Sequence, residues 1–188
     1  YDLNSWTTTN VKTMSQMFYG ASKFNGNISN WDVSEVTTMS QMFQDASDFN
    51  RNISNWTTNQ VTTMSGMFQN ATLFNSELSN WVVSSVTTMS NMFNGASNFN
   101  RDISGWNVSS VTTMESMFQN ASDFNQYIVK WNISNVTNMN SMFNGSSSFN
   151  KPLFRWGITF SNVSGFEPYS VDISVVDMLA NTTSLKYY

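Results

Sequence analysis

The side chains that could do chemistry in this sequence are carboxylates, amides and hydroxyls, because its 188 residues include no Cys and no His. Thiol nucleophiles, triads with a histidine base and Cys/His zinc sites are therefore excluded. Asp45 and Asp48 lie close together in one predicted turn, where their oxygens form either a weak calcium site or a solvated turn. The turn is favoured, since the Asp45 position becomes Asn70 and Gly95 further along. We therefore predict no enzymatic activity, no metal and no cofactor.

A repeat of 25 residues organises the elements that would position these side chains. An uninterrupted period of this length is the signature of a solenoid, in which each unit packs on its neighbours. The tryptophans that mark the period are Trp6, Trp31, Trp56, Trp81, Trp106, Trp131 and Trp156. Paired methionines from Met14/Met17 to Met139/Met142 and two sets of phenylalanines follow the same spacing.

One repeat unit combines two different apolar patterns. Ile28, Trp31 and Val33 match the apolar positions that a leucine-rich repeat uses for its strand. Met39 to Ala46 then places apolar residues at i, i+3, i+4 and i+7, which is typical of one face of a short helix. The sequence thus predicts an α/β repeat solenoid, a leucine-rich-repeat-like right-handed horseshoe with one short parallel strand and one short helix per 25-residue coil.

The period also divides the chain. Residues 1–156 are predicted to form a solenoid of seven coils with a partial first coil, and residues 157–188, where the period breaks, a C-terminal capping segment. The first coil shows no comparable cap, so we expect further repeats before Tyr1 in an intact protein. Because an uncapped coil end exposes apolar residues, the chain could also self-associate through the ends of the solenoid.

Three regular columns, meaning sets of residues that recur every 25 positions, have competing interpretations. The Trp column resembles a stacking platform for sugars or bases, but its place in the repeat favours core packing. The Asn that follows Phe in six units, from Asn25 to Asn150, is interpreted as an asparagine ladder between coils. Paired threonines such as Thr37/Thr38 are expected to cap helices and form hydroxyl ladders, with ice binding as an alternative.

The residues that flank each Trp are the candidate recognition surface. They vary from unit to unit, unlike the apolar columns, and in the predicted geometry they form a concave polar sheet rich in short hydrogen-bonding groups. The predicted partner-binding residues are Asn30, Asp32, Asn55, Thr57, Asn80, Asn107, Lys130 and Asn132. The alternative interpretation is that any solvent-facing sheet must be polar.

Charge excludes two further classes of protein. The formal net charge is −4, and only 11% of the residues are charged. The eight Lys and Arg are scattered and form no basic stripe, so nucleic-acid binding is not expected. The chain has no apolar run of about 18 residues, so we expect no membrane-spanning segment.

The repeat unit resembles a known family. The phrase I-S-N-W-D-V-S-x-V-T-T-M-S-x-M-F-x-x-A-S-x-F-N is similar to the 25/26-residue repeat of bacterial surface proteins of the Mycoplasma and Listeria type. It is also similar to BspA-like leucine-rich repeats. The resemblance covers residues 4–156 and implies an extracellular or cell-surface protein associated with adhesion. We expect a module that binds a glycan or protein through its polar face. The alternative is a structural spacer, stalk or coat component.

Overall fold

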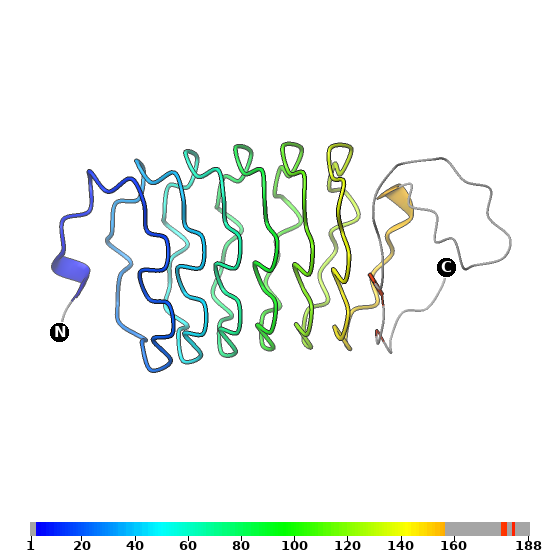
Figure 1. Ribbon diagram of the computed structural model, residues 1–188, viewed down its shortest axis with the longest axis horizontal. Coiled ribbons are helices and arrows are strands. Elements are labelled where there is room, and N and C mark those ends of the chain that lie inside the picture. Colours follow the sequence, from blue (N-terminus) through cyan, green and yellow to red (C-terminus); the bar gives the residue numbers. More distant parts are fainter. Residues whose placement is uncertain (1–2, 157–177, 180–181, 183–188) are drawn as a thin grey trace, which may run out of the picture.

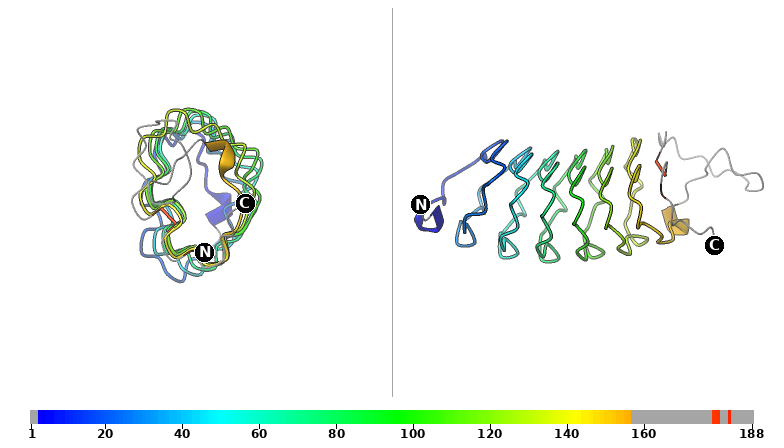
Figure 2. Two further views of the ribbon diagram at one scale, coloured as in Figure 1. Left: turned by 90° about the vertical axis from the view of Figure 1, so that its right-hand side faces the viewer. Right: turned by 90° about the horizontal axis from the view of Figure 1, so that it is seen from below.

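The chain winds into a row of similar coils that stack along one nearly straight axis. The computed structural model describes residues 3–156, 178, 179 and 182. The coils stand side by side in sequence order (Figure 1), and seen along the axis they superimpose as one oblong ring (Figure 2). Backbone contacts join residues 25 positions apart, such as Thr37 N–H to Lys12 C=O at 2.9 Å. Each 25-residue unit of the sequence therefore forms one coil of the structure.

Regular secondary structure is nearly absent from the part of the chain that the structure describes. Its helical elements are two 3₁₀ turns, η1 (Leu3–Ser5) and η2 (Phe154–Trp156). Parallel β-pairing is confined to isolated bridges along one column: Thr13, Thr38, Thr63, Thr88, Thr113 and Asn138. The predicted α/β leucine-rich-repeat-like horseshoe is therefore wrong. The described coils contain neither the predicted strand nor the predicted helix, and they do not curve.

The hydrogen bonds over residues 39–46 explain why the helical spacing does not produce a helix. The N–H groups of Gln41 and Phe43 donate to carbonyls of the next coil, Ser65 and Met67, both at 2.8 Å. Intervening N–H groups close local turns instead, as Gln44 does on Gln41 at 3.2 Å. A helix would need all of these donors within the segment. In this structure every second backbone N–H group donates to the neighbouring coil instead, so the segment does not form a helix.

Two positions in each coil have a left-handed backbone. The first column has φ between 53° and 62° and comprises Gln16, Gln41, Gly66, Asn91, Ser116 and Ser141. The second has φ between 56° and 77° and comprises Gly20, Asp45, Asn70, Gly95, Asn120 and Gly145. Gly, Asn and Asp tolerate this conformation best. The composition of the second column follows from that requirement.

Stacked aromatic columns fill the interior. Phe43 and Phe68 stack with ring centroids 5.6 Å apart, and Phe49 and Phe74 continue the second column at 5.9 Å. Within one coil, Phe43 and Phe49 lie face to face at 3.9 Å. Both rings are fully buried, as are the paired methionines from Met39 to Met142. The repeated Met and Phe residues thus form the core, although no helix carries them.

The tryptophans add hydrogen bonds to the core. Trp31, Trp56, Trp81, Trp106, Trp131 and Trp156 are each at most 4% exposed. Their indole N–H groups donate to a backbone carbonyl 28 residues earlier, as Trp106 does to Leu78 at 3.0 Å. A buried indole needs such a partner. The Trp column is therefore core, and a sugar-stacking platform is ruled out for these six rings.

Polar ladders join the coils at the surface. The Asn50 side chain accepts the backbone N–H of Asn75 at 2.9 Å, and the same bond recurs in every coil from Asn25 to Asn150. Ser40 and Thr63 hydroxyls also pair between coils, at 3.1 Å. The predicted asparagine ladder and hydroxyl ladders are confirmed. Helix capping by the threonines is wrong, because the described coils have no helix to cap.

Most of the predicted C-terminal cap, residues 157–188, lies outside the described residues. Met178 is described and buried, and its carbonyl accepts the N–H of Phe143 at 2.8 Å. In the preceding coils this acceptor is the Met of the next unit, as Met142 is for Phe118 at 2.9 Å. Met178 thus takes the place of a repeat methionine at the C-terminal end of the last coil.

Candidate recognition face

The eight predicted partner-binding residues all lie on the surface, on either side of the buried Trp column. Asn30, Asp32, Asn55, Thr57, Asn80, Asn107, Lys130 and Asn132 are exposed. They belong to two columns, one before and one after each Trp, which run along the straight stack. We call these two columns the polar face. It comprises Asn30, Asn55, Asn80, Gly105, Lys130 and Arg155, together with Asp32, Thr57, Val82, Asn107 and Asn132. The face is neither a sheet nor concave, which corrects that part of the prediction.

Several side chains of the second column hold the local turn. Asp32 accepts the backbone N–H of Ser34 at 2.9 Å, and Asn107 and Asn132 accept the equivalent N–H at 3.2 and 3.1 Å. The Ser34 hydroxyl and backbone N–H lower the pKa of Asp32 below its usual 3.8. These three residues are therefore partly structural. No hydrogen bond involves the exposed side chains of Asn55 and Asn80 among the described residues.

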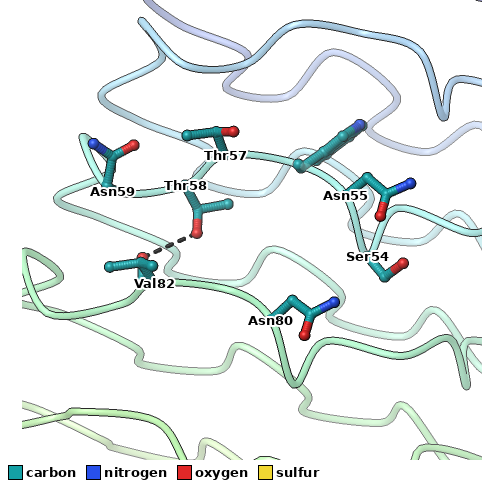
Figure 3. A pocket seen from close by; sticks show the side chains of 8 residues that line it. Ser54, Asn55, Thr57, Thr58, Asn59, Asn80 and Val82 are labelled. Atoms are coloured by element: carbon teal, nitrogen blue, oxygen red, sulfur yellow. Dashed lines mark hydrogen bonds between the residues drawn. The ribbon is translucent and has the colours of Figure 1, made fainter.

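A shallow hollow of about 530 Å³ lies on the polar face between two adjacent coils (Figure 3). Its lining is polar except for Trp56 and Val82, and comprises Ser54, Asn55, Trp56, Thr57, Thr58, Asn59, Asn80 and Val82. Three predicted residues, Asn55, Thr57 and Asn80, meet here. The hollow offers amide and hydroxyl groups to a ligand, with no titratable side chain in its lining.

Sequence reasoning missed the residues that complete the hollow. Thr58 is buried, and its hydroxyl donates to the Val82 carbonyl at 2.9 Å across the hollow (Figure 3). Four other coils carry an apolar residue at this position, such as Val33 and Val83, whereas the first coil has Thr8 there. The replacement of an apolar residue by Thr58 could therefore have been recognised in the sequence. The same bond joins Thr8 to the Asp32 carbonyl at 2.8 Å.

The carboxylates considered for calcium have protein partners instead. The Asn70 amide donates to Asp45 at 2.8 Å, and Asp48 pairs with Lys23 at 3.2 Å. Within residues 3–156 and the three described residues beyond, no three acidic side chains gather as a metal site would require.

The outer threonine of each pair forms an exposed row: Thr37, Thr62, Thr87, Thr112 and Thr137. Each hydroxyl donates to the carbonyl 25 residues earlier, as Thr62 does to Thr37 at 3.1 Å. The inner threonines, such as Thr63, are half-buried and form the bridges between coils. Only one row thus faces solvent, as expected for neighbouring residues that point to different sides.

The geometry defines a repeat protein whose rigid interior carries a variable polar surface. No helix among the described residues is long and apolar enough to cross a membrane. The family model described as Mycoplasma protein of unknown function, DUF285, matches the chain twice, over residues 1–94 and 76–171. The chain belongs to this family. No curated protein and no solved structure matches it. The resemblance to a Mycoplasma-type repeat is thus confirmed, whereas that to BspA-like leucine-rich repeats is not supported.

Proposed function

We propose that this protein is a surface-displayed binding module that recognises a glycan or a protein through its polar face. The observation that carries the proposal is the contrast between two kinds of column. The interior columns keep Trp, Met and Phe in coil after coil, whereas the polar-face column before Trp changes from Asn80 to Gly105 to Lys130. A purely structural role does not require different side chains at the exposed positions, whereas recognition of a partner depends on such differences.

The stacked coils would present this face with little ordering cost. Inter-coil hydrogen bonds and stacked rings fix the backbone on both sides of the hollow, including Trp56, whose indole donates to Ile28 at 3.3 Å. Binding to a preformed surface avoids the entropic cost of ordering loops. Display at the cell surface and adhesion extend this proposal and rest on the resemblance of the repeat to bacterial surface proteins.

The test is a binding screen of the whole chain against arrayed glycans and extracellular proteins. We compare the wild type with the double variant Asn55→Arg/Asn80→Arg, which fills the hollow from two coils. The matched control is Leu73→Arg/Asn98→Arg, which adds the same charge at exposed positions outside the polar face. We expect a partner that the control retains and the double variant loses.

Two other results would contradict the proposal. A partner retained by both variants would place binding elsewhere on the chain. The absence of any partner would favour the alternative, a spacer, stalk or coat component, and the same protein would then be tested for self-assembly by light scattering.

A further inference from the structure

The positive charge of the described coils is unevenly distributed. Residues 124–156 contain Lys130, Lys151 and Arg155 and no Asp or Glu, whereas residues 1–123 contain nine acidic and four basic side chains. Three of those four basic residues pair with carboxylates of neighbouring coils: Lys12 with Glu35, Lys23 with Asp48 and Arg101 with Glu77. Among the described residues, the three cations after residue 124 have no carboxylate partner.

Two exposed aromatic rings accompany these cations. Tyr127 is 58% exposed and Phe154 is 70% exposed, although most aromatic side chains of the described coils are buried. The Lys151 ammonium lies 4.4 Å from the centre of the Tyr127 ring, a cation–π contact. A ring and a charge thus already meet on this surface.

The fold brings these residues from two adjacent coils to one place. The segment with Tyr127 and Lys130 runs beside the segment with Lys151, Phe154 and Arg155. The Trp156 indole, in the second segment, donates to the Ile128 carbonyl of the first at 3.3 Å, and Trp131 stacks on Trp156 at 6.4 Å. Lys130 and Arg155 are successive members of the polar face. The cationic end of the polar face is our name for Tyr127, Lys130, Lys151, Phe154 and Arg155.

We infer that the cationic end of the polar face binds an acidic glycan, with its sugar rings against Tyr127 and Phe154 and its acidic groups beside the three cations. The inference rests on the proposed function, since it names the ligand class for one end of the same face. Aromatic faces suit the C–H surfaces of sugar rings. Exposed amides on the neighbouring polar face, such as Asn132, complement sugar hydroxyls.

The charge distribution favours an acidic glycan over nucleic acid. A nucleic acid carries a charge at every step, and a strand longer than this site would extend over the acidic coils before residue 124. A short acidic oligosaccharide fits within this site and needs only these three cations. The polar residues around the two rings also disfavour insertion into a lipid bilayer, which requires a broad apolar face.

The experiment measures binding of the whole chain to short dextran sulfate oligosaccharides by calorimetry, with neutral dextran of equal length as the comparison. We expect salt-dependent binding of the sulfated chain only. Lys130→Gln/Arg155→Gln should weaken it about tenfold, because two charge-assisted contacts are lost. Tyr127→Ala should weaken it about threefold through loss of ring stacking.

The matched control is Lys12→Gln/Lys23→Gln, which removes the same total charge at the other end of the stack. Equal weakening in the control, or equal binding of neutral dextran, would overturn the inference. So would failure of the sulfated chain to bind while single-stranded DNA or phosphatidylserine vesicles bind and depend on Lys130 and Arg155. Failure here with a partner still found at Asn55 and Asn80 would leave the proposed function standing.

Discussion

The indole N–H of Trp81 donates a hydrogen bond of 3.0 Å to the carbonyl oxygen of Ile53, which lies 28 residues earlier in the preceding coil. The Trp81 side chain is only 3% exposed, so water cannot readily take the place of its indole N–H as the donor to Ile53. The bond couples the interior of one coil to the backbone of another. It explains why Trp, and not Phe, recurs at this position.

Trp81→Phe tests this coupling. We expect a loss of about 1–3 kcal/mol in the free energy of unfolding, because the Ile53 carbonyl keeps its burial and loses its donor. Trp81→Ala should cost about 3–5 kcal/mol through the added cavity. Urea unfolding followed by circular dichroism measures both. The control is Trp6→Phe, since Trp6 is 53% exposed. Equal losses at the two positions would contradict the explanation.

The left-handed columns predict the effect of adding a methyl group. Gly95 has φ +72°, and a Cβ built there would lie 2.3 Å from the Asn70 side-chain oxygen of the preceding coil. Gly95→Ala should therefore reduce the free energy of unfolding by at least about 1–2 kcal/mol, the cost of the backbone conformation alone. Denaturant melts provide the value.

Gly105→Ala is the comparison for this variant, since no heavy atom apart from those of Gly105 and its two chain neighbours lies within 4 Å of a Cβ built there. Its effect should stay within about 0.5 kcal/mol, as for other unconstrained surface changes. If Gly105→Ala destabilises the protein as much as Gly95→Ala, the difference in backbone conformation is not the cause.

The asparagine ladder predicts a distinction between two variants of one residue. The Asn75 side-chain oxygen accepts the Asn100 backbone N–H at 3.1 Å. Asn75→Ala removes this acceptor and should cost about 1 kcal/mol, whereas Asn75→Asp keeps an oxygen in place and should cost less. Thermal unfolding at neutral pH compares them. An equal loss in both variants would show that the amide nitrogen, and not the oxygen, matters.

Acidification should remove a stabilising contribution from Asp102. Hydrogen bonds from the backbone N–H and hydroxyl of Ser104 lower its pKa below 3.8. A lowered pKa in the folded state stabilises the protein above the unfolded value, and the contribution disappears as pH falls through the folded value. Wild type should thus lose more stability than Asp102→Asn between neutral pH and about pH 3.

Asparagine is a suitable replacement because Asn52 makes the same turn at the equivalent position, with Ser54 N–H at 2.9 Å. The variant therefore keeps the turn and loses only the titration. The measurement is the free energy of unfolding of both proteins as a function of pH, obtained by chemical unfolding. Parallel curves for the two proteins would mean that Asp102 does not contribute.

The period, the buried columns and the ladders could be predicted from the sequence, since each depends only on residue type repeated at fixed spacing. The helix was wrong for a reason that the sequence also contained. The position of Asp45, between Phe43 and Ala46, is occupied only by Gly, Asp or Asn, which are poor in helix interiors and tolerant of a left-handed backbone. The helical spacing of the apolar residues favoured a helix despite these residues.

Other features had no such signal. Gln41 and Ser116 adopt the left-handed conformation although neither residue type favours it, and both donate their backbone N–H to the next coil. Exposure of Asn55 and Asn80 could be predicted from their variation between units. The hollow between them could not, because its lining comes from two adjacent coils.

The equal length of every unit has an evolutionary consequence. Because the contacts of each coil reach residues at a constant offset in its neighbours, removing or duplicating one whole unit leaves the remaining registers unchanged. Recombination between the similar gene segments that encode the coils would therefore yield folded proteins of different length. Each exchange would also create a new order of polar-face residues, so that one ancestral gene could diversify its surface without remaking its core.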